Sequence, residues 1–190
     1  LMNGVLRTLF RMDNLVQFRF VAMAFSFCSL FFIYQLLVFY WGRQTAQMAL
    51  ALWVVNPFWI QHADYSHHAP YGAFFGFGSV YFLVRALRAE RRGLLLASGA
   101  FLFFTVLSSY DYWFFAPLLL AMATLAHYRR LTSGALIRTL AFLAAFAIAG
   151  LLFKIATNAW GLGGIQAWLH DIRFQFAERG TDKITRTSYG

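Results

Sequence analysis

Charged side chains are scarce in this chain of 190 residues. Aspartate, glutamate, lysine and arginine make up 12% of it, whereas hydrophobic residues make up 61% and aromatic residues 20%. Soluble domains carry roughly 25% charged residues. The 16 basic and seven acidic side chains are too few to cover a solvated surface of this size. The composition therefore excludes an ordinary soluble domain and predicts an integral membrane protein.

The chain has only one cysteine, and it lacks the common nucleotide-binding and catalytic motifs. The single cysteine, Cys28, excludes an internal disulfide. No phosphate-binding loop, no Ser-His-Asp order and no CxxC pair is present, and the "GLGG" stretch at 161–164 lacks the strand and helix of a dinucleotide fingerprint. The sequence begins at Leu1 without a signal-peptide pattern and ends abruptly, so we expect a fragment of a longer chain.

The net charge of +9 has two readings, nucleic-acid binding or loop charges of a membrane protein. The arginines occur in short clusters between apolar runs, which is typical of membrane-protein loops. We therefore expect membrane lipids, and no nucleic acid, as partners.

The apolar runs predict an all-α, polytopic membrane helix bundle with about six transmembrane helices in residues 19–158. About 20 apolar residues cross a bilayer, and proline at 57 should end or kink the second helix. The mostly apolar run of 36 residues at 93–128 is too long for one span and is broken by the polar stretch "SSYDYW" at 108–113. The expected helices lie near 20–42, 44–55, 71–84, the two halves of 93–128, and 135–157.

Positive charge predicts how this bundle is oriented. If the helices alternate, eight arginines fall on one face, and the turns at 60–70 and 108–112 on the other face contain no lysine or arginine. Short basic loops mark the cytoplasmic side. The outer side then holds residues 1–18, as an amphipathic surface helix or an ordinary loop helix, and the amphipathic tail 159–190. The eight are Arg43, Arg85, Arg88, Arg91, Arg92, Arg129, Arg130 and Arg138.

Two aspartates lie next to the apolar spans, at the outer turns. Ionisable groups at membrane depth are costly unless they face a wet cavity or a partner, so Asp64 and Asp111 indicate a polar cleft. The alternative is that both are solvated turn residues or helix caps. The expected cleft residues are Asp64, Tyr65, Ser109, Tyr110 and Asp111, with Ser108 beside them.

The stretch "NPFWIQHADYSHHAPYG" at 56–72 carries the histidines. Proline suits the first turn of a helix, so a helix should start at Ala69 or Pro70, and a helix N-terminus flanked by histidines favours an anion such as phosphate. A metal site formed by His62, Asp64, His67 and His68 has no established ligand spacing. We therefore assign no metal and no cofactor, with a divalent cation as the alternative.

The order of these features resembles the polytopic GT-C glycosyltransferases of the protein mannosyltransferase and aminoarabinose transferase kind, over roughly residues 5–155. An arginine opens the first span, "NP" closes the next, and a polar segment with a tyrosine follows. An arginine-rich loop and a span that ends in a short polar turn complete the order.

The resemblance implies transfer of a sugar from a polyprenyl-phosphate donor on the periplasmic or lumenal side, in an enzyme of the bacterial inner membrane. It implies that the donor phosphate binds near His62, His67, His68 and Tyr71. The family's arginine two residues before that tyrosine is Ala69 here, and its histidine in the second turn is Ser109. The family's acidic base would precede Leu1, so the catalytic residue is unknown.

Two other classes remain open. One is a non-catalytic GT-C-like subunit of a larger membrane complex, which the changes at Ala69 and Ser109 favour. The other is a transporter, although its ionisable groups would be expected near the membrane midplane, not at helix ends.

Overall fold

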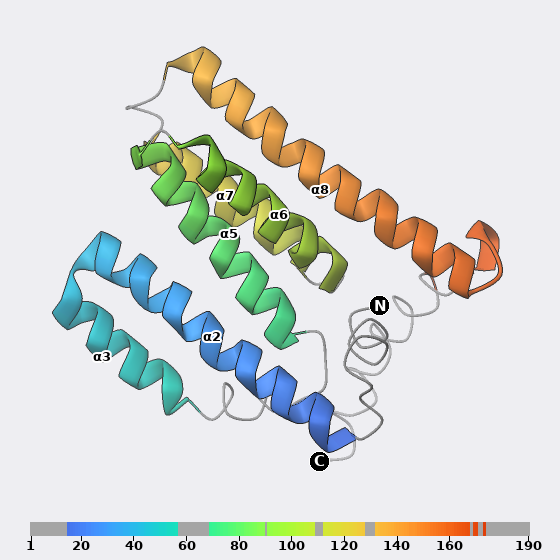
Figure 1. Ribbon diagram of the computed structural model, residues 1–190, viewed down its shortest axis with the longest axis horizontal. Coiled ribbons are helices and arrows are strands. Elements are labelled where there is room, and N and C mark those ends of the chain that lie inside the picture. The colour runs from blue at the N-terminus through green and yellow to red at the C-terminus, as the bar shows by residue number, and fades with distance from the viewer. Residues whose placement is uncertain are drawn as a thin grey trace, which may run out of the picture. The chain divides into compact units, whose positions relative to one another are not determined.

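The computed structural model describes residues 15–56, 69–89, 91–108, 112–127, 132–167, 169, 170 and 173. Within these residues all regular secondary structure is helical and no strand occurs, as the sequence predicts. The main helices, shown in Figure 1, are α2 (Leu15–Trp41), α3 (Arg43–Val54), α5 (Ala69–Ala89), α6 (Arg92–Ser108), α7 (Tyr112–His127) and α8 (Ser133–Gly161).

Two of the described helices are long and apolar enough to cross a membrane. They cover Arg19–Trp41, with 23 residues, and Gly134–Gly161, with 28 residues. At 1.5 Å per residue these lengths reach about 35 and 42 Å, beyond the roughly 30 Å of a hydrocarbon core. α6 is apolar but has only 17 residues, and the 12 residues of α3 extend for only about 18 Å. Six complete crossings therefore remain a prediction.

Helix boundaries follow the residues that break helices. α2 ends at Trp41, and Gly42, with a φ of 84°, provides the turn into α3. A positive φ is accessible to glycine without the strain that a side chain would bring. α3 ends at Val54, two residues before Asn56-Pro57, as predicted from the proline.

The first described helix begins before the expected start of the first span. Residues 15–18, expected to belong to the N-terminal surface helix, form the start of α2 and continue into the apolar span without a break. No glycine or proline separates these residues from the span. Residues 1–14 lie outside the described part of the chain.

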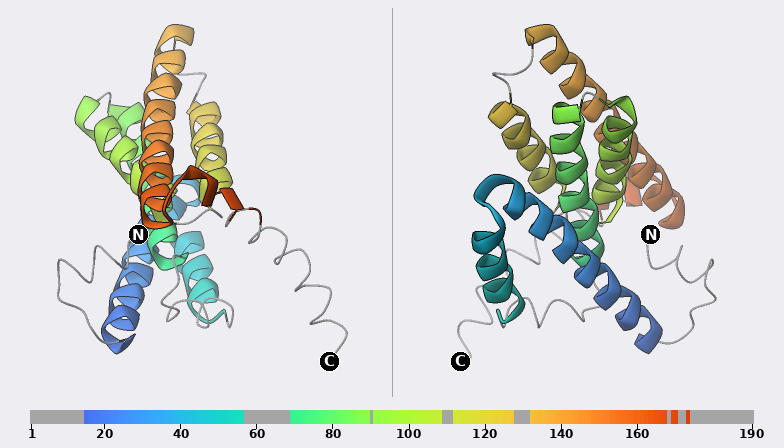
Figure 2. Two further views of the ribbon diagram at one scale, coloured as in Figure 1. Left: turned by 90° about the vertical axis from the view of Figure 1, so that its right-hand side faces the viewer. Right: turned by 60° about the vertical axis from the view of Figure 1, so that its left-hand side comes forward.

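The chain divides into two compact units, Leu1–Leu151 and Leu152–Gly190. In the first unit, α2 and α5 run in the same direction, because Phe25 contacts Tyr71 near their starts and Phe39 lies beneath Arg88 near their ends. α3 folds back along α2 (Figures 1 and 2). The parallel direction of α2 and α5 is the one expected when the chain runs back between them, as it does along α3.

α5 and α6 form an antiparallel pair. Phe75 stacks on Phe104 with ring centroids 5.1 Å apart, and Ser79 bonds to Ser98 nearer the other end. The part of α8 in this unit runs parallel to α6, because the Gly99 backbone meets the Phe146 ring and that of Gly150 meets Phe103. The start of α5 and the end of α6 therefore lie at one end of the unit.

Small residues allow these helices to pack closely. A Cβ placed on Gly78 would lie 2.4 Å from the Phe101 ring, and one on Gly99 would lie 2.7 Å from the Phe146 ring. Helix packing in lipid relies on such close approach, because apolar side chains gain little by leaving lipid for protein. Around these contacts lies a core of Val80, Leu83, Val84, Leu102, Val106, Leu120, Ala123 and Leu143.

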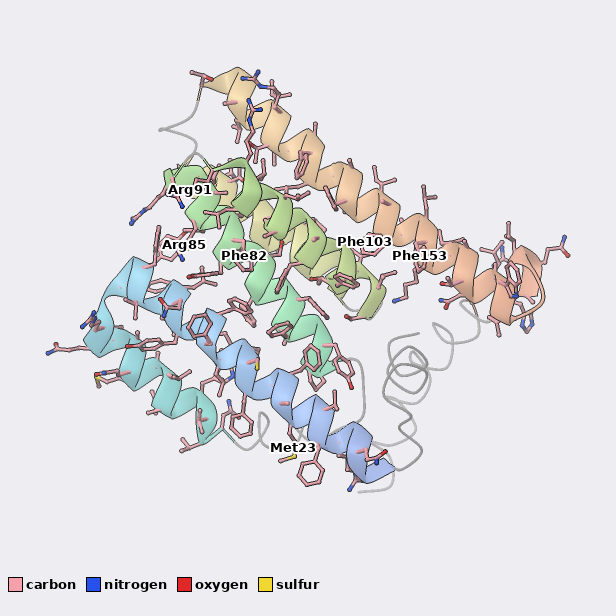
Figure 3. All side chains as sticks on the ribbon, in the orientation of Figure 1. Met23, Phe82, Arg85, Arg91, Phe103 and Phe153 are labelled. Atoms are coloured by element: carbon pink, nitrogen blue, oxygen red, sulfur yellow. The ribbon has the colours of Figure 1, made fainter. Side chains whose placement is uncertain are left out.

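All the described arginines of this unit except Arg19, near the start of α2, gather at the end opposite the start of α5. Figure 3 shows Arg85 and Arg91 at the end where α2 turns into α3. Among the eight arginines assigned to one face, those that the structure describes follow this pattern, since each lies at the end of α5 or at the start of α3, α6 or α8. They are Arg43, Arg85, Arg88, Arg91, Arg92 and Arg138.

Candidate anion site at the start of α5

Tyr71 is the one member of the predicted phosphate site that the structure describes. It lies in the first turn of α5 and is fully buried, against Val21, Phe25 and Phe75. The Phe25 ring meets it edge-on, with centroids 4.9 Å apart. Its hydroxyl group has no hydrogen-bond partner in the described part of the chain. A buried hydroxyl group left unpaired costs about 1–3 kcal/mol.

The local sequence explains why a helix begins here. α5 starts at Ala69, as predicted, and Pro70 is buried in its first turn. Proline has no amide hydrogen to leave unpaired at a helix start, and its fixed φ suits that position. The first amide groups of a helix have no intrahelical partner and carry the positive end of its dipole. The Tyr71 hydroxyl group and this helix end therefore provide donors in one region.

The end of α6 lies at the same level of the bundle as the start of α5. Phe75 stacks on Phe104 across the antiparallel pair, and one helical turn further along each helix lie Tyr71 and Ser108. α6 ends at Ser108 and α7 begins at Tyr112. The segments that precede α5 and follow α6 therefore leave the bundle from neighbouring helix ends.

Ser108 has a local structural role. It is buried, and its hydroxyl group donates a 2.7 Å hydrogen bond to the Phe104 carbonyl within α6. Its single hydrogen is thus committed to the helix backbone, and only the oxygen lone pairs can accept a further bond.

The other predicted site residues lie outside the described residues. This applies to the histidines of the phosphate site, His62, His67 and His68. It applies equally to the cleft residues Asp64, Tyr65, Ser109, Tyr110 and Asp111. Their convergence on one cleft stays a prediction. In the described part of the chain, no group of three or more histidine, cysteine, aspartate or glutamate side chains could hold a metal.

Lys154 is a buried charge that the sequence reasoning missed. It belongs to the second unit, lies within the apolar Gly134–Gly161 segment and is only 5% exposed. The Thr157 hydroxyl group donates to its backbone carbonyl at 3.1 Å. The available signal was its isolation: it is the only charged residue between Arg138 and Asp171. An ionisable residue inside an apolar helix is a functional candidate by default.

The second unit also has an open, apolar hollow of about 800 Å³. It lies where α8 ends and the chain turns through Gly163 and Gly164, both with positive φ. Aliphatic side chains and the exposed Trp160 line it. With almost no polar lining, the hollow suits a hydrocarbon chain better than a polar substrate.

Comparison of the chain with protein-family models, curated proteins and solved structures finds no match. The class that the structure itself defines is a helical protein with two helices capable of crossing a membrane.

Proposed function

We propose that this chain is a membrane-embedded glycosyltransferase module of the GT-C kind. It transfers a sugar from a polyprenyl-phosphate donor to an acceptor on the periplasmic or lumenal side of a bacterial inner membrane. The proposal combines the order of sequence features from Arg19 to Arg130 with the position of Tyr71 in the bundle.

Exposed apolar side chains support a lipid environment. On α2, Phe20, Phe27 and Phe31 are 68%, 64% and 54% exposed. α8 exposes Ile137 and Ile148 in the same way. Large apolar patches on an isolated chain indicate a membrane or a partner surface, and the length of these two helices favours the membrane.

The observation that carries the proposal is the unpaired hydroxyl group of Tyr71. A phosphate oxygen that accepts its hydrogen would satisfy a buried donor and would lie at a helix N-terminus. His67 and His68, directly before α5, would supply further donors to the phosphate.

The opposite positions of arginines and phosphate site support the direction of transfer. The arginine end is the cytoplasmic one by the positive-inside rule, so the start of α5 faces the periplasm or lumen. A lipid-linked donor would enter from the bilayer with its phosphate at this interface. An acidic residue would act as the base that activates the acceptor hydroxyl group, and Asp64 or Asp111 is the candidate within this sequence.

Donor binding by the purified full chain tests the proposal. Tyr71→Phe should weaken binding of a polyprenyl-phosphate sugar roughly five- to tenfold, because one hydrogen bond to a charged group is lost. Tyr81→Phe is the matched control, because it also removes a tyrosine hydroxyl group from α5. Tyr81 lies toward the arginine end, where its hydroxyl group accepts a hydrogen bond from Arg85, so this variant should bind the donor as the wild type does. Equal affinity of wild type and Tyr71→Phe would contradict the proposed site.

The second candidate is a non-catalytic membrane subunit. It is favoured by α3, which is too short to cross a bilayer and exposes Met48 (70%) and Leu52 (71%), side chains that a partner helix could cover. An acidic residue in an outer loop encoded directly upstream of Leu1 would favour the enzyme, and absence of such a residue would favour the subunit.

A further inference from the structure

Two arginines are held in place where α2 and α5 end side by side. The Arg88 guanidinium group lies over the Phe39 ring of α2, 3.6 Å from its centroid. Arg85 donates a 2.9 Å hydrogen bond to the hydroxyl group of Tyr81, one turn earlier on α5. Tyr81 itself faces α2, because its ring lies 5.5 Å from that of Phe32. Both arginines are exposed. We call Arg85 and Arg88, together with their aromatic partners Tyr81 and Phe39, the α2–α5 seam.

The surroundings of the seam are basic and aromatic. Residues 85–92 contain four arginines and one acid, Glu90, which lies outside the described residues. Arg43 is exposed just beyond the Gly42 turn. At the end of α2, Tyr40 and Trp41 are 41% and 64% exposed. Tyrosine and tryptophan prefer the headgroup level of a bilayer, so the arginines lie where lipid phosphates are found.

We propose that the α2–α5 seam binds the phosphate of an anionic phospholipid in the leaflet at the arginine end. A guanidinium group can give two parallel hydrogen bonds to a phosphate. Both seam arginines keep donors available, because the Phe39 ring takes the face of Arg88 and Tyr81 takes one nitrogen of Arg85. Their aromatic partners also reduce the side-chain freedom lost when lipid binds.

The exposed apolar face of α2 beside the seam arginines selects this occupant. A soluble anion could use the same donors, but only a phospholipid would also lay its acyl chains along the apolar face of α2, where Phe31 is exposed. The inference rests on the membrane embedding contained in the proposed function and is independent of sugar transfer. A failed donor-binding test would leave it standing.

Native mass spectrometry of the full chain in detergent tests the inference. The wild type should bind its first phosphatidylglycerol molecule about tenfold more tightly than its first phosphatidylcholine molecule, since each basic group adds a modest electrostatic attraction to an anionic lipid. The double variant Arg85→Gln/Arg88→Gln should lose this preference. Inorganic phosphate at matched concentration should not displace the lipid. Displacement by phosphate would overturn the lipid assignment.

Arg138→Gln is the matched control for position. Arg138 lies at the same end of the unit and is exposed, but its side chain donates to the Gly134 carbonyl on α8. Its variant should keep the preference for phosphatidylglycerol. If Arg138→Gln and the double variant lose the preference equally, the attraction is spread over the surface and the seam is not a site.

A charge-conserving variant separates lipid binding from folding. Arg85→Lys/Arg88→Lys keeps both charges but loses the planar, bidentate donors, so we expect a partial loss of the preference, about threefold, with unchanged helix content by circular dichroism. An unchanged preference in this variant would overturn the bidentate geometry. If the glutamine variant does not fold, this comparison decides the proposal.

Discussion

Ser79 and Ser98 bond to each other's backbone across the α5–α6 contact. The Ser79 hydroxyl group donates to the Ser98 carbonyl at 2.9 Å, and the Ser98 hydroxyl group donates to the Ser79 carbonyl at 2.8 Å. Both residues are fully buried. Each serine thus donates to a backbone carbonyl of the other helix, so the two backbones must approach closely.

This reciprocal pair should behave as one unit when it is mutated. Ser79→Ala and Ser98→Ala should each lower the free energy of unfolding by about 1 kcal/mol, in the range measured for hydrogen bonds between membrane helices. Because the two hydroxyl groups also lie 3.4 Å from each other in one hydrogen-bond network, the two losses should be coupled and not simply additive. Thermal or denaturant unfolding in detergent measures them.

Ser29→Ala is the control for this pair. Its hydroxyl group is also buried but donates to the Ser26 carbonyl within α2, so its removal leaves the contact between helices intact. We expect a smaller loss of stability. If the control costs as much as Ser79→Ala, the interhelical bonds contribute nothing specific.

The glycine at position 150 should be the least tolerant of a methyl group among the glycines of α8. A Cβ there would lie 3.0 Å from the backbone oxygen of Phe103, which cannot turn away as a side chain can. Gly150→Ala should lower the free energy of unfolding by about 1–3 kcal/mol, as overpacking does. Gly134→Ala meets no atom within 4 Å and should be neutral or slightly stabilising. Equal stability of the two variants in detergent would contradict the packing of α8 on α6.

Removal of the Tyr71 hydroxyl group should stabilise the ligand-free protein. An unpaired buried hydroxyl group opposes folding, so Tyr71→Phe should raise the free energy of unfolding by about 1 kcal/mol. The same variant weakens donor binding if the proposed function holds, and this opposition between stability and binding is typical of functional sites. A destabilised Tyr71→Phe would show that the hydroxyl group has a structural partner.

The sequence predicted the helices well because their signals are local. Proline placed the end of α3 and the start of α5, and the uncharged run before Arg43 placed α2. α2 begins at Leu15, before the expected start near residue 20, because no glycine or proline separates residues 15–18 from the span.

Contacts between distant segments could not be predicted from the same signals. The pairing of Ser79 with Ser98 and of Arg88 with Phe39 depends on which helices pack, in which direction and at which rotation. Tyr71 was assigned to the site from its place after the histidines, but its unpaired hydroxyl group becomes visible only once the neighbouring helices surround it. Lys154 was missed because a single lysine in an apolar run does not reveal whether it faces lipid, water or protein.

The orientation of the bundle is tested by single cysteines in intact cells. Cys28 is exposed and must first be replaced by serine. Cysteines introduced at Ser66 and Ser109 flank the helix ends at the start of α5 and the end of α6, and both should react with a membrane-impermeant thiol reagent from outside. A cysteine at Ala89, at the arginine end of α5, should react only after the membrane is permeabilised.

Because the α5–α6 pair is antiparallel, positions 66 and 109 must behave alike whichever way the protein is inserted. Opposite labelling of these two positions would contradict the fold, whereas labelling of Ala89 alone from outside would reverse the orientation and remove the proposed site from the periplasmic or lumenal face.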